Sequence, residues 1–134
     1  MKYDCHMHMV LDGVVRNVID YIIDEIGCEY TIEPDLSTVD PTLDGVENFL
    51  KNTKEGYCVQ YATSATLLLR SVGVPTRYVE GYIAPKFTRN EAEDRIGTYL
   101  CNVKDSNAHA WCEIYLENYG WLTTEVTTPY YSEM

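Results

Sequence analysis

The sequence predicts an α+β fold in which helices come first and an antiparallel β-sheet follows. Apolar residues recur at helical spacing before Gly73, whereas runs rich in aromatic and β-branched residues follow Pro75. Helices and strands segregated along one chain are typical of this class. The 134 residues match the size of one domain. We therefore expect residues 1–11 to be a flexible N-terminal segment and residues 12–134 to form a single domain.

Three helices are predicted in the first part of the chain. In the first, apolar side chains repeat on one face and Gly27 is a stop signal. Asp40 or Thr42 is expected to cap the second helix. The third is rich in alanine and leucine, which indicates the central, buried helix. The predicted helices cover residues 14–26, about 43–55 and about 57–73, and residues 28–41 are predicted to be a loop.

The sheet is predicted from three strand-like segments. The second and third flank the stretch Asn118 to Gly120, which has the composition of a hairpin turn. Residues 86–106 are polar and mixed in sign, so we expect a loop that borders a site, with a short strand around residues 99–103. The three predicted strands cover residues 77–84, 108–116 and 121–126.

The formal net charge of −11 argues against a nucleic-acid partner, because such a field repels phosphate backbones. An acidic surface that aids solubility explains the charge without any partner. No apolar run approaches the roughly eighteen residues that a membrane-spanning helix needs. The N-terminus lacks the basic and then apolar order of a signal peptide, and the compartment stays open because a longer chain can carry the targeting segment elsewhere.

Cysteine usage does not predict a disulfide scaffold, because the count is odd and no CxxC spacing occurs. Reduced thiols are the expectation. Cys5, His6 and His8 form the run CHMH, which invites a metal interpretation. Zinc, however, needs about four well-placed ligands, and no partner cluster is evident. We therefore expect no metal and no other cofactor. The five cysteines are residues 5, 28, 58, 101 and 112.

One cysteine stands out by its position. Cys58 follows Gly56 and Tyr57 at the predicted start of the buried helix. There its sulfur lies near unpaired backbone N–H groups and the positive end of the helix dipole, which both favour the thiolate. A thiolate held at a helix terminus is a rigid nucleophile. The alternative is a small buried hydrophobic residue, which is the commoner role of a cysteine taken alone.

A nucleophilic thiol needs a general base, and His109 is the candidate. It stands at the start of the strand HAWCEIYL and exchanges protons near neutral pH, as histidine does. The neighbouring strand WLTTEV offers Glu125 to orient the imidazole if the two strands pair across the turn. Glu125 is equally well explained as a surface carboxylate.

Three segments resemble the transglutaminase-like superfamily: VENFLKNTKEGYC, GYCVQYATSATLLLRSVGVPTRYVEGY and HAWCEIYLENYGWLTTEVTTP. The resemblance covers residues from about 12 to 130 and consists of ordered motifs at compatible spacing. It implies a papain-like core, in which a helix bearing the nucleophile at its N-terminus packs on an antiparallel sheet bearing a histidine and an acid. It also implies that Cys58 is the nucleophile and His109 the base.

The resemblance places the third catalytic residue at Glu125, where the family pattern usually has aspartate. Glutamate is one methylene longer, and a misplacement of about 1 Å can lower a catalytic rate strongly. Asp105, four residues before His109, is a possible alternative orienting acid. Arg77 and Glu113 also match charged positions of the family, and we expect a structural pair. If that pair is buried, truncating one partner costs roughly 3–5 kcal/mol of stability.

The expected chemistry is cysteine-dependent acyl transfer on peptide or side-chain amides, without a cofactor. The backbone N–H of Cys58 is one expected oxyanion donor, and Gln60 is a candidate for a second. Hydrolysis by a peptidase or amidase is favoured, because no clustered carboxylates at calcium-loop spacing occur. The alternatives are a protein-crosslinking transglutaminase and a catalytically weak binding module that retains the fold. A peptide or protein is the expected substrate.

Overall fold

The structure, a computed structural model, describes residues 5–84, 88–89 and 97–127, with the backbone alone for residues 5–12 and 88–89. The chain divides into two compact units, each described by itself below. The first unit contains Met1–Val79 and Ala110–Met134, and the second contains Glu80–His109. The expectation of a single domain over residues 12–134 stays a prediction. No helix in the described ranges is both long and apolar enough to cross a membrane.

The first helix is longer than its apolar pattern predicts. Helix α1 spans Cys5–Asp20 and continues as the π-helix η1, Tyr21–Glu25. The apolar periodicity marks only the part of the helix that faces the core. The residues before Gly13 contain no helix breaker, and the helix extends through them. The expected boundary after residue 11 therefore falls inside a helix. Gly27, with φ of +83°, stops the helix as predicted.

The second helix has a different cap from the one predicted. Helix α2 spans Gly45–Asn48 and continues as the π-helix η2, Phe49–Thr53. Its N-cap is Asp44, whose Oδ1 accepts a hydrogen bond from the Glu47 N–H at 2.9 Å. The prediction of Asp40 or Thr42 is wrong, because the Asp40 carboxylate accepts from the Thr42 N–H and closes a turn of its own.

One strand of a short parallel ladder lies within the stretch predicted to be a loop, and its partner lies at the predicted end of the second helix. Strand β1, Glu29–Tyr30, pairs with β2, Glu55–Gly56. Strands of two residues carry no periodic signal, so the sequence pattern could not reveal them. The ladder matters for function because β2 ends two residues before Cys58.

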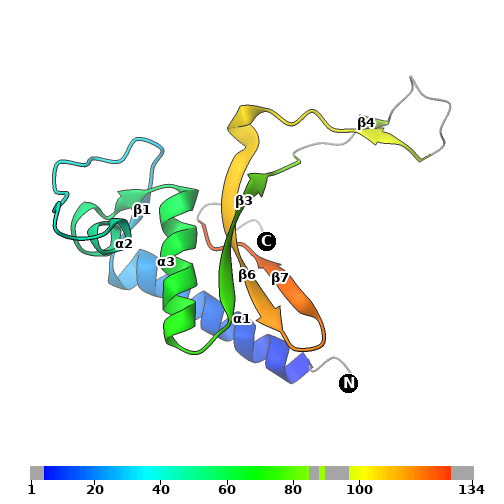
Figure 1. The fold of residues 1–134 in the computed structure, drawn as a ribbon, viewed down its shortest axis with the longest axis horizontal. Coiled ribbons are helices and arrows are strands. Elements are labelled where there is room, and N and C mark those ends of the chain that lie inside the picture. The colour runs from blue at the N-terminus through cyan, green and yellow to red at the C-terminus, as the bar shows by residue number, and fades with distance from the viewer. Residues whose placement is uncertain (1–4, 85–87, 90–96, 128–134) are drawn as a thin grey trace. The chain divides into compact units, whose positions relative to one another are not determined.

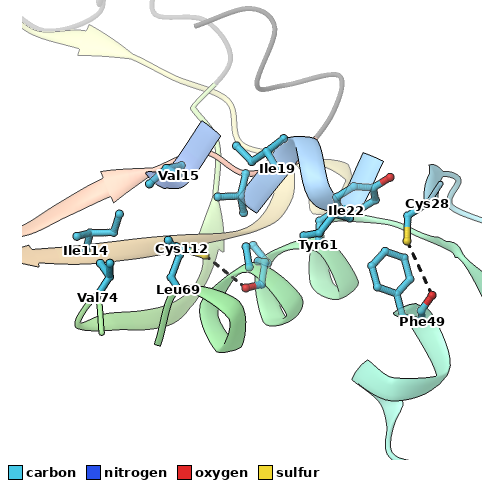
Figure 2. Close-up of a cluster of buried hydrophobic side chains, with 14 residues drawn as sticks. Val15, Ile19, Ile22, Cys28, Phe49, Tyr61, Leu69, Val74, Cys112 and Ile114 are labelled. Atoms are coloured by element: carbon cyan, nitrogen blue, oxygen red, sulfur yellow. Dashed lines mark hydrogen bonds between the residues drawn. The ribbon is translucent and has the colours of Figure 1, made fainter. Parts of the chain in front are cut away.

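The third helix agrees with the prediction. Helix α3 spans Cys58–Ser71 and contributes Tyr61 and Leu69 to the core, both at most 1 % exposed. Figure 2 shows side chains from α1, α3 and the sheet packed in one cluster. The sulfur of Cys112 contacts this helix directly, with its thiol donating to the Ala62 carbonyl oxygen at 3.3 Å. This packing fixes α3 against the sheet.

Three strands form the sheet, in the spatial order β3-β6-β7. Figure 1 shows neighbouring strands running in opposite directions, which confirms the predicted antiparallel sheet and the α+β class. In the β6–β7 hairpin, Cys112 pairs with Thr124 and Leu116 pairs with Gly120. Asn118 and Gly120 both adopt positive φ in the turn, as the predicted hairpin requires. The strands are β3, Thr76–Tyr82; β6, Ala108–Leu116; and β7, Gly120–Thr124.

The second unit contains a small antiparallel ladder. Strand β4, Thr88–Arg89, pairs with β5, Tyr99–Leu100, so the short strand expected around residues 99–103 exists in its first two residues. The 3₁₀-helix η3, Asp105–Asn107, precedes β6. The Ile83 N–H donates to the Asn107 carbonyl oxygen at 2.9 Å, which ties the two ends of this unit together.

Candidate active site

Cys58 is the first residue of α3. The N-cap, Tyr57, has extended backbone angles of φ −123° and ψ −163°, so the chain turns sharply into the helix at this point. N–H groups in the first turn have no acceptor within a helix and remain available to a ligand or a developing anion. The Cys58 side chain is partly exposed. The predicted position of this thiol at the N-terminus of the buried helix is therefore confirmed.

Backbone hydrogen bonds from β1 hold the segment that leads to Cys58. The Glu29 N–H donates to the Lys54 carbonyl oxygen at 2.8 Å, and the Thr31 N–H donates to the Gly56 carbonyl oxygen at 2.7 Å. Lys54 itself adopts a left-handed conformation with φ of 53° as it closes η2. The chain thus reaches Cys58 from an anchored strand rather than from a free loop.

The helical repeat assigns Cys58 to the face of α3 that packs on the sheet. With about 3.6 residues per turn, Cys58 shares a side with Ala62, Ala65 and Leu69. All three of these residues are fully buried. Ala62 contacts Cys112 of β6. The thiol thus begins the row of side chains that α3 directs at β6.

A pocket of about 300 Å³ lies on another face of the same helix. It is lined by Val59, Gln60 and Thr63 of α3, by Val46 of α2 and by Phe49 of η2. Gln60 and Thr63 lie more than a third of a turn around the helix from Cys58. This pocket is therefore not the space into which the thiol projects.

Gln60 contributes a contact that the sequence analysis did not assign. Its Oε1 accepts a hydrogen bond from the Tyr57 N–H at 3.0 Å. A glutamine at the third helical position is the sequence signature of a capping box, and that signal could have predicted this bond. The side-chain carbonyl is directed at the backbone that precedes Cys58.

His109 belongs to the second unit, where it is the second residue of β6. Its side chain is buried, with 6 % exposure. Asp105, the alternative orienting acid, lies in η3 of the same unit and is exposed. The pairing of Cys58 with His109 stays a prediction.

Glu125 directly follows the last residue of β7. The strand therefore ends two residues before its predicted end at residue 126. Its Oε1 accepts hydrogen bonds from the N–H groups of Val126 at 3.1 Å and Thr127 at 3.0 Å. These two bonds fix the carboxylate at the end of the hairpin. Its role as an orienting acid stays a prediction.

Two of the other cysteines are held as neutral thiols. Burial raises the pKa of Cys28 to about 11. Burial raises the pKa of Cys112 to about 11 as well, and the negative charge of Glu125 adds to that effect. Both residues are fully packed in the core, whereas Cys58 and Cys101 are partly exposed. Accessibility therefore separates Cys58 from the buried thiols.

Arg77 and Glu113 form the expected ion pair, but the pair is not buried. Arg77 Nη2 lies 2.6 Å from Glu113 Oε1, and the Arg77 side chain is 48 % exposed. The guanidinium also lies over the Trp121 ring, 4.2 Å from its centroid. The pair joins neighbouring strands on the outer face of the sheet, so solvent screens it and the large cost of a broken buried pair does not apply.

We expect Arg77→Ala to lower the free energy of unfolding by about 1–2 kcal/mol, from the screened ion pair and the lost contact with Trp121. Urea denaturation followed by circular dichroism measures this change. Lys51→Ala is the matched control, because Lys51 makes an exposed helical ion pair with Glu47 at 3.2 Å and no aromatic contact. Its expected cost is about 0.5 kcal/mol or less. Equal effects of the two substitutions would contradict a structural role for the contact with Trp121.

Metal binding finds no support in the described part of the chain, which contains no group of three or more ligating side chains. The side chains of Cys5, His6 and His8 lie outside the described residues. The CHMH run is therefore not tested by the structure.

Comparison with known proteins gives consistent matches. The family model described as the transglutaminase-like superfamily matches residues 9–126. The chain is 40 % identical over 84 residues to the uncharacterized protein YebA of Bacillus subtilis, which covers 63 % of this chain and 11 % of that protein. It is 37 % identical over 98 residues to a protein-glutamine gamma-glutamyltransferase of Pseudomonas aeruginosa, which covers 73 % of this chain and 13 % of that protein.

Two solved structures also resemble this chain. The periplasmic domain of TgpA from Pseudomonas aeruginosa, in a crystal structure bound to ethylmercury, superposes with a TM-score of 0.61 at 32 % identity. The match covers 85 % of this chain and 37 % of that one. A second crystal structure of the same domain gives a TM-score of 0.60. The chain thus spans well under half the length of each of these relatives.

Proposed function

The chain belongs to the transglutaminase-like superfamily, and from this premise we propose that it catalyses acyl transfer on amides of peptides or proteins through a Cys58 thioester. The observation that carries the proposal is the position of Cys58. Cys58 is the first residue of the central helix α3, and its side chain is partly exposed. It is adjacent to N–H groups that have no acceptor within the helix.

In the proposed reaction, Cys58 Sγ attacks the amide carbonyl carbon and His109 accepts the thiol proton. The Cys58 N–H donates a hydrogen bond to the oxyanion of the tetrahedral intermediate. The C–N bond then breaks, His109 returns the proton to the leaving amine, and a thioester remains. Water attacks the thioester and releases a carboxylic acid, or a primary amine attacks it and forms a new amide. No cofactor enters these steps.

Glu125 is the proposed orienting acid for the imidazole. Two backbone N–H groups hold its Oε1, at 3.0 and 3.1 Å, so the longer side chain is restrained rather than free to sample rotamers. Such restraint offsets the disadvantage of a glutamate at a position where the family usually has aspartate. Asp105 is the weaker candidate because its side chain is exposed.

Hydrolysis is the favoured outcome of the thioester, and transamidation is the second candidate. The observation in favour of transamidation is the name of the relative that shares 37 % identity, a protein-glutamine gamma-glutamyltransferase. That name also suggests the side-chain amide of glutamine as the acyl donor. A non-catalytic binding module would need neither an accessible Cys58 nor a base.

We expect iodoacetamide to modify Cys58 near neutral pH much faster than Cys28 and Cys112, because burial raises the pKa of both of these thiols to about 11. His109→Ala should slow the reaction at Cys58 alone. Peptide mapping by mass spectrometry over time measures each rate.

The matched control for His109→Ala is His8→Ala, which removes a histidine outside the proposed site. It should leave the alkylation rate of Cys58 unchanged. If Cys58 reacts no faster than an ordinary exposed thiol, or if His109→Ala has no effect, the catalytic proposal fails and a binding module becomes the better explanation.

A further inference from the structure

We infer that Gln60 is a positioning residue for Cys58, and that residue 56 is glycine so that the Gln60 side chain can lie against the backbone there. The inference rests on the proposed function, because positioning matters only if Cys58 is the nucleophile. It gives Gln60 a different role from that of an oxyanion donor. We call the contact between Gly56, Tyr57 and Gln60 the Gln60 clamp.

The first part of the Gln60 clamp is a hydrogen bond. Gln60 Oε1 accepts from the Tyr57 N–H at 3.0 Å, and Tyr57 is the residue immediately before Cys58. Tyr57 is the N-cap of α3, so its N–H has no backbone acceptor within the helix. The bond fixes the peptide group through which the chain enters the helix. The side-chain oxygen of Gln60 therefore sets the direction from which Cys58 is presented.

The second part is a close contact at Gly56. A Cβ atom at this position would lie 2.8 Å from Gln60 Cβ, 2.9 Å from Cγ and 3.0 Å from Oε1. The Gln60 Cβ is fixed by the backbone of α3, so it cannot move aside as the end of a flexible side chain would. Gly56 is not among the residues with positive φ, so the requirement for glycine here is steric rather than conformational.

The backbone of Gly56 is also held by the ladder of β1 and β2. The Thr31 N–H donates to the Gly56 carbonyl oxygen at 2.7 Å, within the ladder of β1 and β2. Gly56 thus contacts both Thr31, which follows β1, and Gln60. Cys58 follows Gly56 by two residues. A displacement of about 1 Å in a reacting group can lower a rate by about 10²-fold. A contact this close to Cys58 can therefore change the rate at which Cys58 reacts.

Substitution of Gln60 separates positioning from oxyanion donation, because the two roles use different atoms. Gln60→Glu keeps the acceptor oxygen and removes the NH₂ donor, whereas Gln60→Met keeps the length of the side chain and removes both. For Gln60→Met we expect the alkylation rate of Cys58 to fall by about tenfold and the Tyr57 amide to exchange with solvent faster. Gln60→Glu should restore both properties. High salt in all samples screens the added charge.

The readouts are the rate of Cys58 alkylation from peptide mapping and the exchange of the Tyr57 amide from NMR, with a thermal scan to verify that each variant is folded. Wild-type behaviour of Gln60→Met in both readouts overturns the inference. Gln60→Glu that reacts as slowly as Gln60→Met while the Tyr57 amide stays protected also overturns it, because the acceptor oxygen would then not set the reactivity of Cys58. An unreactive Cys58 in the wild type defeats the proposed function instead, and the Tyr57 exchange still tests the hydrogen bond separately.

Gly56→Ala probes the close contact independently. Alone it should slow Cys58 alkylation by about tenfold, because the added Cβ would lie too close to the Gln60 Cβ and the backbone before Cys58 would have to shift. In a Gln60→Gly background all three of the contacting atoms are absent, so Gly56→Ala should add little to the effect of Gln60→Gly. Independent, multiplying effects of the two substitutions would contradict a shared clamp.

Discussion

Cys58→Ala is expected to lower amide turnover by at least about 10³-fold, to the level of the uncatalysed reaction. The reason is that every step of the proposed reaction passes through the sulfur of this residue. The assay is ammonia release from a glutamine-containing peptide that has no lysine and has a blocked N-terminus, measured with and without a small primary amine. Ammonia release without the amine indicates hydrolysis, and incorporation of the amine into the protein indicates transamidation.

Cys101→Ala is the matched control, since Cys101 is another partly exposed cysteine but lies in the second unit and has no proposed role. It should retain turnover. The substitution at Cys58 also removes little packing, because the side chain is partly exposed. Turnover that survives Cys58→Ala would rule out the thioester mechanism, and an equal loss in both variants would point to damage to the fold.

The largest expected effect on stability comes from Leu69→Ala. Leu69 is fully buried in the cluster that Figure 2 shows, where α3 packs against α1 and β6. Removing its side chain beyond Cβ loses burial and leaves a cavity, which typically costs about 2–5 kcal/mol. Natural domains unfold with about 5–15 kcal/mol, so the loss takes up a large part of the total. Chemical denaturation followed by circular dichroism measures it.

Leu67→Ala provides the comparison on the same helix. Leu67 is 46 % exposed and lies on the side of α3 away from the sheet. The same change in chemistry should therefore cost about 0.5 kcal/mol or less. Similar losses for the two variants would mean that the assigned faces of α3 are wrong, and with them the direction given to Cys58.

Much of the fold could be predicted because its signals are local. The apolar face of α3, the alternation in β6 and the turn residues Asn118 and Gly120 all belong to short stretches of sequence. Burial of one helix face or one sheet face imposes a period, and that period is visible without any structure. Cys58 was found in the same way, because a helix start and its first residue are local features.

Other features needed the tertiary structure. Asp44 rather than Asp40 caps α2, because several residues in that stretch have side chains suited to capping and only the path of the chain selects one. The ladder of β1 and β2 joins residues far apart in sequence over two residues each, too short for any pattern. Arg77 was recognised as the partner of Glu113, yet its exposure depends on which face of the sheet the pair occupies.

By itself, therefore, the sequence determined the class of fold, the order of its main elements, the superfamily and the residue at the start of the central helix. These follow from periodicity and from motifs that are contiguous in the chain. Only the tertiary structure decided which contacts hold the backbone before Cys58. The Gln60 side chain contacts Tyr57 and Gly56, and the Thr31 N–H next to β1 donates to the Gly56 carbonyl oxygen. The physical reason is that β1 reaches this site from a distant part of the chain, and the path of the chain between them is not encoded in any local pattern.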